Sequence, residues 1–276
     1  MTTSTPTHLP IALTIAGSDS GGGAGIQADL KTFHRFGVFG TSVVTAITAQ
    51  NTTGVRAIHP VPMTNIRAQL DAVAEDLRPA ALKTGMLATE EVVREVASGI
   101  QSHALAPYVM DPVMVATSGD RLLESVAETS LRDHLLPLAT VVTPNLEEAE
   151  ILTGMEVRVE AQMRTAARAL VELGAGAALV KGGHLPSGGI VDVLWDGSSE
   201  HVWRRHRIET VHTHGTGCTL SAAAAAALAR GVPLEDSVAL AIDFVRRAME
   251  SAPGLGSGHG PLNHMVPAFP ADPPSG

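Results

Sequence analysis

Short runs of apolar and β-branched residues alternate along the chain with segments that carry apolar side chains at helical spacing. Strands that alternate with helices in this way call for a mostly parallel sheet, covered by helices on both faces and joined by right-handed crossovers. The predicted strands cover residues 11–16, 41–49, 55–59, 81–83, 108–110, 140–143 and 177–181, with an antiparallel hairpin at 190–195 and 201–207. The predicted helices cover residues 26–36, 64–77, 90–100, 126–136, 146–152, 160–173, 222–230 and 234–250.

The composition fits one layered α/β domain. The chain has 276 residues, of which 45% are hydrophobic but only 3% aromatic, so its core must be built from Val, Ile, Leu and Ala. We predict a single domain over residues 11–265. A flexible segment, 1–10, precedes it, and a flexible proline-rich tail, 266–276, follows it.

The net charge and the cysteine content of the chain indicate which binding partners and which cellular compartment to expect. The opening residues lack a basic region and a long apolar run, so we predict no signal peptide, and no apolar stretch reaches membrane-spanning length. A single cysteine fits a reducing compartment, so we expect a cytoplasmic protein with no membrane partner. The formal net charge of -9 argues against a nucleic-acid partner, and any bound phosphate must be met by local groups.

The polar and glycine-rich segments of the chain follow the predicted strands. In open parallel sheets, ligands bind outside the carboxyl ends of the strands, so we expect these segments to share one edge of the sheet. They are residues 17–25, Gln50, residues 83–86, 111–113, 145–148 and 181–184, and the loop around Gly215.

A glycine loop runs directly into an alanine-rich helix near the end of the chain. Gly215 and Gly217 leave the N–H groups of the first helical turn uncovered, which would cradle an anion, most plausibly a phosphate. The alternative is that both glycines only make a tight turn. Cys218 lies in that first turn, where the helix dipole favours a thiolate, although a lone buried cysteine is more often a small apolar residue.

A second glycine motif invites a different interpretation. Residues 23–28, Gly-Ala-Gly-Ile-Gln-Ala, satisfy the loose dinucleotide pattern G-x-G-x-x-G/A between a strand and a helix. A nicotinamide-dependent oxidoreductase also needs an acidic residue at the end of the second strand, and that region reads Ala49-Gln50-Asn51. No Walker A lysine follows the glycines, so an ATP site would have to be built another way.

Three further strand ends carry charge. Asn145 and Glu148 could organise hydrated magnesium beside a phosphate, although the same spacing resembles a helix capping box. Lys181 beside two glycines suits a phosphate, although many such lysines are simply solvated, and Asp111 places a carboxylate at another strand end. The pair His212 and His214 lacks a second ligand pair, so we do not predict zinc there.

Eight motifs, in order from about residue 11 to about residue 264, closely resemble the hydroxymethylpyrimidine/phosphomethylpyrimidine kinases of thiamine biosynthesis. The resemblance implies an α/β fold of the ribokinase-like type, a three-layer αβα sandwich with a mostly parallel central sheet. It also implies ATP as co-substrate, Mg²⁺, and two successive phosphorylations of 4-amino-5-hydroxymethyl-2-methylpyrimidine. The motifs are LTIAGSD (13–19), GGAGIQADLKT (22–32), TA (45–46) with AQNT (49–52), TGML (84–87), DPVM (111–114), TPNL (143–146), KGGH (181–184) and HGTGCTLS (214–221).

The resemblance also assigns roles to individual residues. It implies that Cys218 stands where sugar kinases of this fold have an aspartate base, in an anion hole for the transferring phosphoryl group. It implies that Gln50 recognises the edge of the pyrimidine ring. The implied set is Gly215, Thr216, Gly217 and Cys218 for catalysis; Gly17, Asp29, Gln50, Met86 and Val113 for the substrate; Asn145, Lys181 and Thr213 for ATP; and Glu148 and Asp111 for magnesium.

Other functions stay open beside the pyrimidine kinase. A pyridoxal kinase is the nearest alternative, because related members accept vitamin B6 compounds, and the nicotinamide oxidoreductase is a weaker one. A non-catalytic pyrimidine sensor of the same fold is a third, but it would not need the groups that the phosphates require, and Lys181, Asn145, Glu148 and Cys218 are all present. We expect a homodimer.

Overall fold

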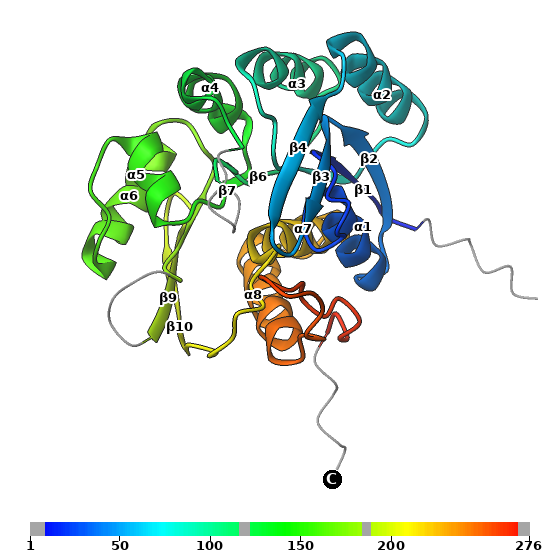
Figure 1. The fold of residues 1–276 in the computed structure, drawn as a ribbon. Helices are drawn as coiled ribbons and strands as arrows, with labels where there is room; N and C mark the ends of the chain where they lie inside the picture. Colours follow the sequence, from blue (N-terminus) through cyan, green and yellow to red (C-terminus); the bar gives the residue numbers. More distant parts are fainter. Residues whose placement is uncertain (1–8, 116–121, 184–188, 270–276) are drawn as a thin grey trace, which may run out of the picture.

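The computed structural model describes residues 9–115, 122–183 and 189–269 as alternating strands and helices (Figure 1). The helices are α1 (Gly25–Arg35), α2 (Met63–Asp76), α3 (Glu90–Ser102), α4 (Ser125–Ser130), α5 (Leu146–Thr153), α6 (Glu160–Glu172), α7 (Thr216–Ala229) and α8 (Leu234–Glu250). The strands are β1 (Ile11–Ala16), β2 (Phe39–Val44), β3 (Ala46–Asn51), β4 (Gly54–Pro60), β5 (Ala81–Thr84), β6 (Tyr108–Met110), β7 (Val141–Val142), β8 (Ala178–Lys181), β9 (Gly189–Trp195) and β10 (Glu200–His206).

One sheet forms the middle layer, in the order β10-β9-β8-β7-β6-β5-β1-β2. The strands from β2 to β8 in this order are parallel, whereas β9 runs antiparallel to both of its neighbours. Helices α1, α7 and α8 cover one face, and α2 to α6 cover the other (Figure 1). Neighbouring residues of β1 point to opposite faces, since Ala12 packs with the first group and Leu13 with the second. The predicted three-layer αβα architecture is confirmed.

Helix α7 is central to the layer that covers one face. Its six alanines at residues 222–227 are fully buried, because the helix packs on the sheet while α1 and α8 pack on the helix. A helix that is apolar on every side needs such an enclosed position. Alanine allows these close approaches because it has no side chain beyond Cβ, and it is also the best helix former. The packing therefore fixes the start of α7, at Thr216, relative to the sheet.

The run at 41–49, predicted as a single strand, is two strands. β2 ends at Val44, and the chain turns out of the main sheet at Thr45, whose N–H donates to the carbonyl of Ala16 at 3.0 Å and whose hydroxyl donates to that of Met86 at 2.8 Å. β3 then pairs with β4 in a separate antiparallel hairpin. The β-branched pattern predicts extended backbone throughout, but the partner strand is set by these distant contacts.

The helix predicted at 126–136 is also interrupted. It is α4, then a π-helical turn at Leu131–Leu135, then a 3₁₀ turn at Leu136–Leu138. Pro137 lies within the last turn, and proline has no N–H to continue an α-helical ladder. The other predicted elements are present and differ only at their ends.

The structured chain continues past the predicted boundary at residue 265. Ala268 is buried, and the ring of Phe269 lies 5.7 Å from that of Phe36 and 5.3 Å from the guanidinium of Arg230. Residues 266–269 therefore pack on the helical layer that contains α1 and α8. Over the described ranges, the structure has no helix with the length and apolar character that crossing a membrane requires.

The close packing of α7 can be tested with one enlarged side chain. We expect Ala224→Leu to lower the free energy of unfolding by about 1–3 kcal/mol, since Ala224 has no exposed surface and the added atoms must displace the sheet or α8. Ala229→Leu, at the half-buried last turn of the same helix, is the matched control and should cost less. Urea denaturation of both variants measures the difference, and equal costs would contradict the enclosed position.

Candidate active site

The carboxyl ends of the parallel strands meet along one edge of the sheet, here called the rim. Gly17 follows β1, Met86 follows β5, Asp111 follows β6, Asn145 follows β7 and Lys181 ends β8. A β-bridge joins Asn145 to Lys181. The expectation that these segments share one edge is confirmed for those that follow β1, β5, β6, β7 and β8. Gln50 instead lies on β3, in the separate hairpin, and His184 lies outside the described residues.

The loop before α7 faces the charged part of the rim. Gly215 has φ +81°, and a Cβ there would overlap the carbonyl oxygen of Gly23, so only glycine fits this turn. A Cβ on Gly217 would lie 3.5 Å from Nζ of Lys181 and 3.7 Å from Oδ2 of Asp111. The carbonyl of Thr213 accepts from both the N–H and the hydroxyl of Thr216.

The N–H groups of Gly217 and Cys218 have no hydrogen-bond partner within the described parts of the chain. They belong to the first turn of α7, where the helix dipole adds positive charge. Free amides at a helix start, opposite a lysine, form a site for an anion. The geometry favours the anion cradle over a mere tight turn.

Asp19 organises the neighbouring glycine loop, a role that sequence analysis missed. Its Oδ2 accepts from the N–H groups of Gly23 and Ala24 at 2.9 and 2.8 Å, and its Oδ1 accepts from that of Gly21 at 2.8 Å. Nε2 of His214 lies 2.9 Å from the same Oδ2. Burial would raise the pKa of Asp19, but these hydrogen bonds outweigh it and lower the pKa. The only available signal was an aspartate two residues before a glycine run.

Asp111 and Glu148 form a buried charged cluster with Lys181. Nζ of Lys181 and the hydroxyl of Ser221 donate to Asp111 at 3.4 and 3.2 Å. Glu148 accepts from the N–H of Asn145 at 2.8 Å, and the Asn145 side chain accepts in return, so the capping box is real. Burial raises the pKa of Glu148 to about 7, against the effect of Lys181 and with that of Asp111. The Glu148 carboxylate therefore needs a nearby cation to stay charged.

The remaining predicted substrate residues line the first half of the rim. Gln50, at the end of β3, is half-buried, and its side-chain nitrogen lies 3.3 Å from Nε2 of His214. A Cβ on Gly17 would lie 3.2 Å from the sulfur of Met86. Val113 is half-buried just after β6. Of these residues, Gln50 lies beside His214, which directly precedes the 215–218 loop, and the contact of all of them with a substrate stays a prediction.

Lys83 is a buried charge that sequence analysis did not single out. It lies on β5 with no exposed surface, and its Nζ donates to Oδ1 of Asp29 at 3.1 Å, while Thr14 donates to Oδ2 at 2.6 Å. Burial would lower the pKa of Lys83, but Asp29, Cys218 and Asp111 together outweigh it and raise the pKa. Both oxygens of Asp29, a predicted substrate residue, are engaged within the protein.

The Cys218 thiol is protonated at neutral pH, in contrast to the thiolate that its helix position favours. Burial raises its pKa to about 11; Lys83 opposes the rise, whereas Asp29 and Asp111 add to it. A hydrogen bond from the N–H of Gly25 also favours the thiolate but is weaker than burial. The helix dipole alone therefore does not activate this sulfur.

Known proteins with similar sequences identify the family. The sequence profile described as phosphomethylpyrimidine kinase matches residues 19–263. The chain belongs to this family. A hydroxymethylpyrimidine/phosphomethylpyrimidine kinase of Rhizobium meliloti is 52% identical, over 92% of this chain and 97% of the relative. The protein of that name in Bacillus subtilis is 49% identical, over 92% and 94%.

Solved structures agree with the fold. The ADP complex of Bacillus subtilis pyridoxal kinase has a TM-score of 0.87 and 40% identity, covering 93% of this chain and 97% of that one. The phosphomethylpyrimidine kinase of Clostridium difficile has a TM-score of 0.79 and 40% identity, covering 87% and 99%. These matches confirm the predicted family and the ribokinase-like fold, and they leave the nicotinamide oxidoreductase interpretation without support.

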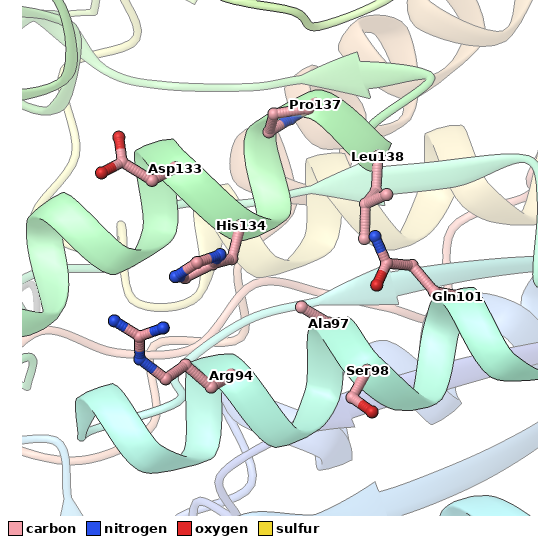
Figure 2. Close-up of a pocket in the computed structure, with 8 residues that line it drawn as sticks. All are labelled: Arg94, Ala97, Ser98, Gln101, Asp133, His134, Pro137 and Leu138. Carbon is pink, nitrogen blue, oxygen red and sulfur yellow. The ribbon is translucent and has the colours of Figure 1, made fainter.

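A separate groove lies far from this chemistry. It has a volume of about 250 Å³ and lies between α3 and the π-helical turn, where Arg94 extends toward His134 (Figure 2). The last turn of α3 and the 3₁₀ turn lead into the amino ends of β6 and β7, so the groove is on the opposite edge of the sheet. It contains none of the predicted site residues.

The buried ion pair beneath the site predicts a stability effect. Lys83→Met should lower the free energy of unfolding by about 3–5 kcal/mol, because the Asp29 carboxylate is left buried without its cation. Adding Asp29→Asn should restore most of the loss, since the amide oxygen can still accept from Thr14. Urea denaturation measures both, and a single variant as stable as the wild type would contradict the pairing.

The raised pKa of Cys218 predicts its alkylation profile, which is clean because the chain has one cysteine. Iodoacetamide reacts with the thiolate, so with a pKa of about 11 the rate should rise about tenfold per pH unit from pH 7 to 9.5. Mass spectrometry of the intact protein follows the reaction. A plateau below pH 9 would show that the thiolate is stabilised after all.

Proposed function

We propose that this chain is an ATP-dependent kinase that phosphorylates 4-amino-5-hydroxymethyl-2-methylpyrimidine and then its monophosphate, in thiamine biosynthesis. The observation that carries the proposal is the pair of free N–H groups on Gly217 and Cys218, opposite Lys181, in a chain of the phosphomethylpyrimidine kinase family. Phosphoryl transfer asks a protein mainly to position its substrates and to stabilise charge. The rim supplies groups for both tasks.

Each end of the site has a distinct task in this proposal. The free N–H groups of Gly217 and Cys218 stabilise the charge that develops on the transferring phosphoryl group. Lys181 meets the phosphates of ATP, together with Asn145, which a β-bridge joins to it, and with Thr213, whose carbonyl accepts from Thr216 at the start of α7. Gln50, Asp29, Met86, Val113 and the Gly17 backbone hold the pyrimidine so that its hydroxyl faces the phosphoryl group.

Mg²⁺ belongs to the proposal as a partner of the nucleotide. The described residues include no group of three or more His, Cys, Asp or Glu side chains that could hold a metal by themselves. Mg²⁺ usually binds through one or two carboxylates together with substrate phosphates and waters, and Glu148 and Asp111 fit that set. It would neutralise charge on the phosphates. Burial raises the pKa of Glu148, and the repulsion between Glu148 and Asp111 adds to the rise; a bound cation would relieve that repulsion.

A coupled ATP assay tests the function directly. The wild-type protein should turn over the hydroxymethyl pyrimidine and, separately, its monophosphate. Pyridoxal is the second substrate to compare, because a solved pyridoxal kinase superposes on this chain with a TM-score of 0.87. A kcat/KM for pyridoxal well above that for either pyrimidine would assign the chain to vitamin B6 instead.

Cys218 can be tested as the residue that accepts the proton of the substrate hydroxyl. General-base assistance is worth about 10²- to 10⁴-fold, so Cys218→Ala should lower kcat in that range while the KM values for pyrimidine and ATP change little. Cys218→Asp should recover part of the loss, because a carboxylate can accept the same proton. Near-normal kcat in Cys218→Ala would show that the sulfur only packs at the helix start while the amides stabilise the charge.

Assembly and location are the remaining parts of the proposal. We propose a homodimer in the cytoplasm, with no nucleic-acid or membrane partner. Light scattering on the eluting protein measures the assembly, and a monomer at micromolar concentration would contradict it.

A further inference from the structure

The carboxamide of Gln50 lies between two side chains that restrict how it can turn. Its Nε2 is 3.3 Å from Nε2 of His214, and its Oε1 is 3.3 Å from Oγ1 of Thr48. Each ring nitrogen of a neutral imidazole either carries a hydrogen and donates it, or has a lone pair and accepts one. Whether Nε2 of His214 donates or accepts therefore decides whether the oxygen or the nitrogen of the Gln50 amide can hydrogen-bond to it.

His214 presents a hydrogen at this nitrogen. The same Nε2 lies 2.9 Å from Oδ2 of Asp19, which already accepts from the N–H groups of Gly23 and Ala24. The pKa of Asp19 is lowered, so it is a carboxylate that can only accept. Nε2 of His214 therefore donates, and the amino group of Gln50 cannot donate to it.

Thr48 presents a lone pair at the other end of the amide. Its hydroxyl hydrogen donates to the carbonyl of Ser18 at 2.8 Å, a shorter contact than the 3.3 Å to Gln50. With that hydrogen used, Oγ1 offers only acceptor capacity to the amide. Rotating the amide by 180° exchanges its oxygen and nitrogen. The amino group can then donate to Oγ1 of Thr48, and the amide oxygen can share the single Nε2 hydrogen of His214 with Asp19 in a three-centre hydrogen bond.

We propose that His214 and Thr48 fix the Gln50 carboxamide with its oxygen toward His214 and its amino group toward Thr48, and thereby set which way round the aminopyrimidine lies. This inference rests on the proposed function and deepens it. His214 is a positioning residue in it, because it acts on the substrate through Gln50.

The orientation of the Gln50 amide determines the orientation of the pyrimidine ring. One oxygen lone pair and one N–H of Gln50 remain for a ligand; they match the 4-amino group and the adjacent ring nitrogen of the pyrimidine. The amino group then lies on the His214 side, and so does the neighbouring 5-hydroxymethyl group. On that side the chain continues from His214 into residues 215–218, where phosphoryl transfer is proposed. A reversed amide would turn the hydroxyl away from this loop.

The test compares the aminopyrimidine with its analogue that lacks the 4-amino group. His214→Phe should lower kcat/KM for the aminopyrimidine about 10- to 100-fold more than for the analogue, because only the former depends on the amide oxygen. In a Gln50→Leu background the extra loss should vanish. Loss of equal size for both substrates, undiminished in that background, would show that His214 only supports the loop and would overturn the inference.

Thr48 provides an independent test if His214→Phe does not fold. Thr48→Val removes the acceptor for the Gln50 amino group, whereas Thr48→Ser keeps the hydroxyl. Thr48→Val should reduce discrimination between the two pyrimidines, and Thr48→Ser should retain it. Equal discrimination in the two variants would overturn the inference. A wild-type protein that phosphorylates neither pyrimidine would instead refute the proposed function, so the two failures are distinguishable.

Discussion

The carboxylate of Asp19 joins two parts of the rim that are far apart in the sequence. It accepts from the backbone of the 19–25 loop and from His214, which directly precedes the loop at the start of α7. Gly215 packs so closely on Gly23 that neither loop could move without the other. The 19–25 loop and the loop at the start of α7 are therefore joined by a single buried acceptor, which replaces water for several N–H groups.

The formal net charge of the chain is -9, and two lysines near the site are each paired with an aspartate in the absence of any ligand. Lys83 is paired with Asp29, and Lys181 with Asp111. A buried charge without a partner is costly, so the carboxylates stabilise the lysines before any phosphate arrives. Arrival of a nucleotide with its divalent cation would let Lys181 turn to the phosphates while Asp111 and Glu148 turn to the metal. In the proposed reaction the charges would thus be exchanged between partners, and none would have to be exposed to water.

Much of this site could be predicted from the sequence, because a parallel sheet brings all its strand ends to one edge. That rule alone grouped Asp111, Asn145 and Lys181 correctly. It placed Lys83 at this edge but could not identify its ion pair, because a lysine inside a short strand gives no sign that its partner comes from a helix 54 residues earlier. Nor could it find the break at Thr45, whose direction depends on the carbonyls of Ala16 and Met86. Local pattern determines which segments are extended, but contacts between distant segments determine where each goes.

The raised pKa of Cys218 bears on when the substrate gives up its proton. A thiol with a pKa of about 11 is not a ready base at neutral pH, although Lys83 lowers that value from beneath the loop. In a loose transition state the attacking hydroxyl forms little bond to phosphorus, so it becomes strongly acidic only late in the transfer. In the proposed reaction a base is then needed only after the bond to the leaving phosphate is largely broken, while the free amides of Gly217 and Cys218 would stabilise the charge on the transferring phosphoryl group. In the proposed reaction, the free amides and Lys181 would supply the electrostatic stabilisation of the phosphoryl group, and the sulfur of Cys218 would need only to accept a proton that is already leaving.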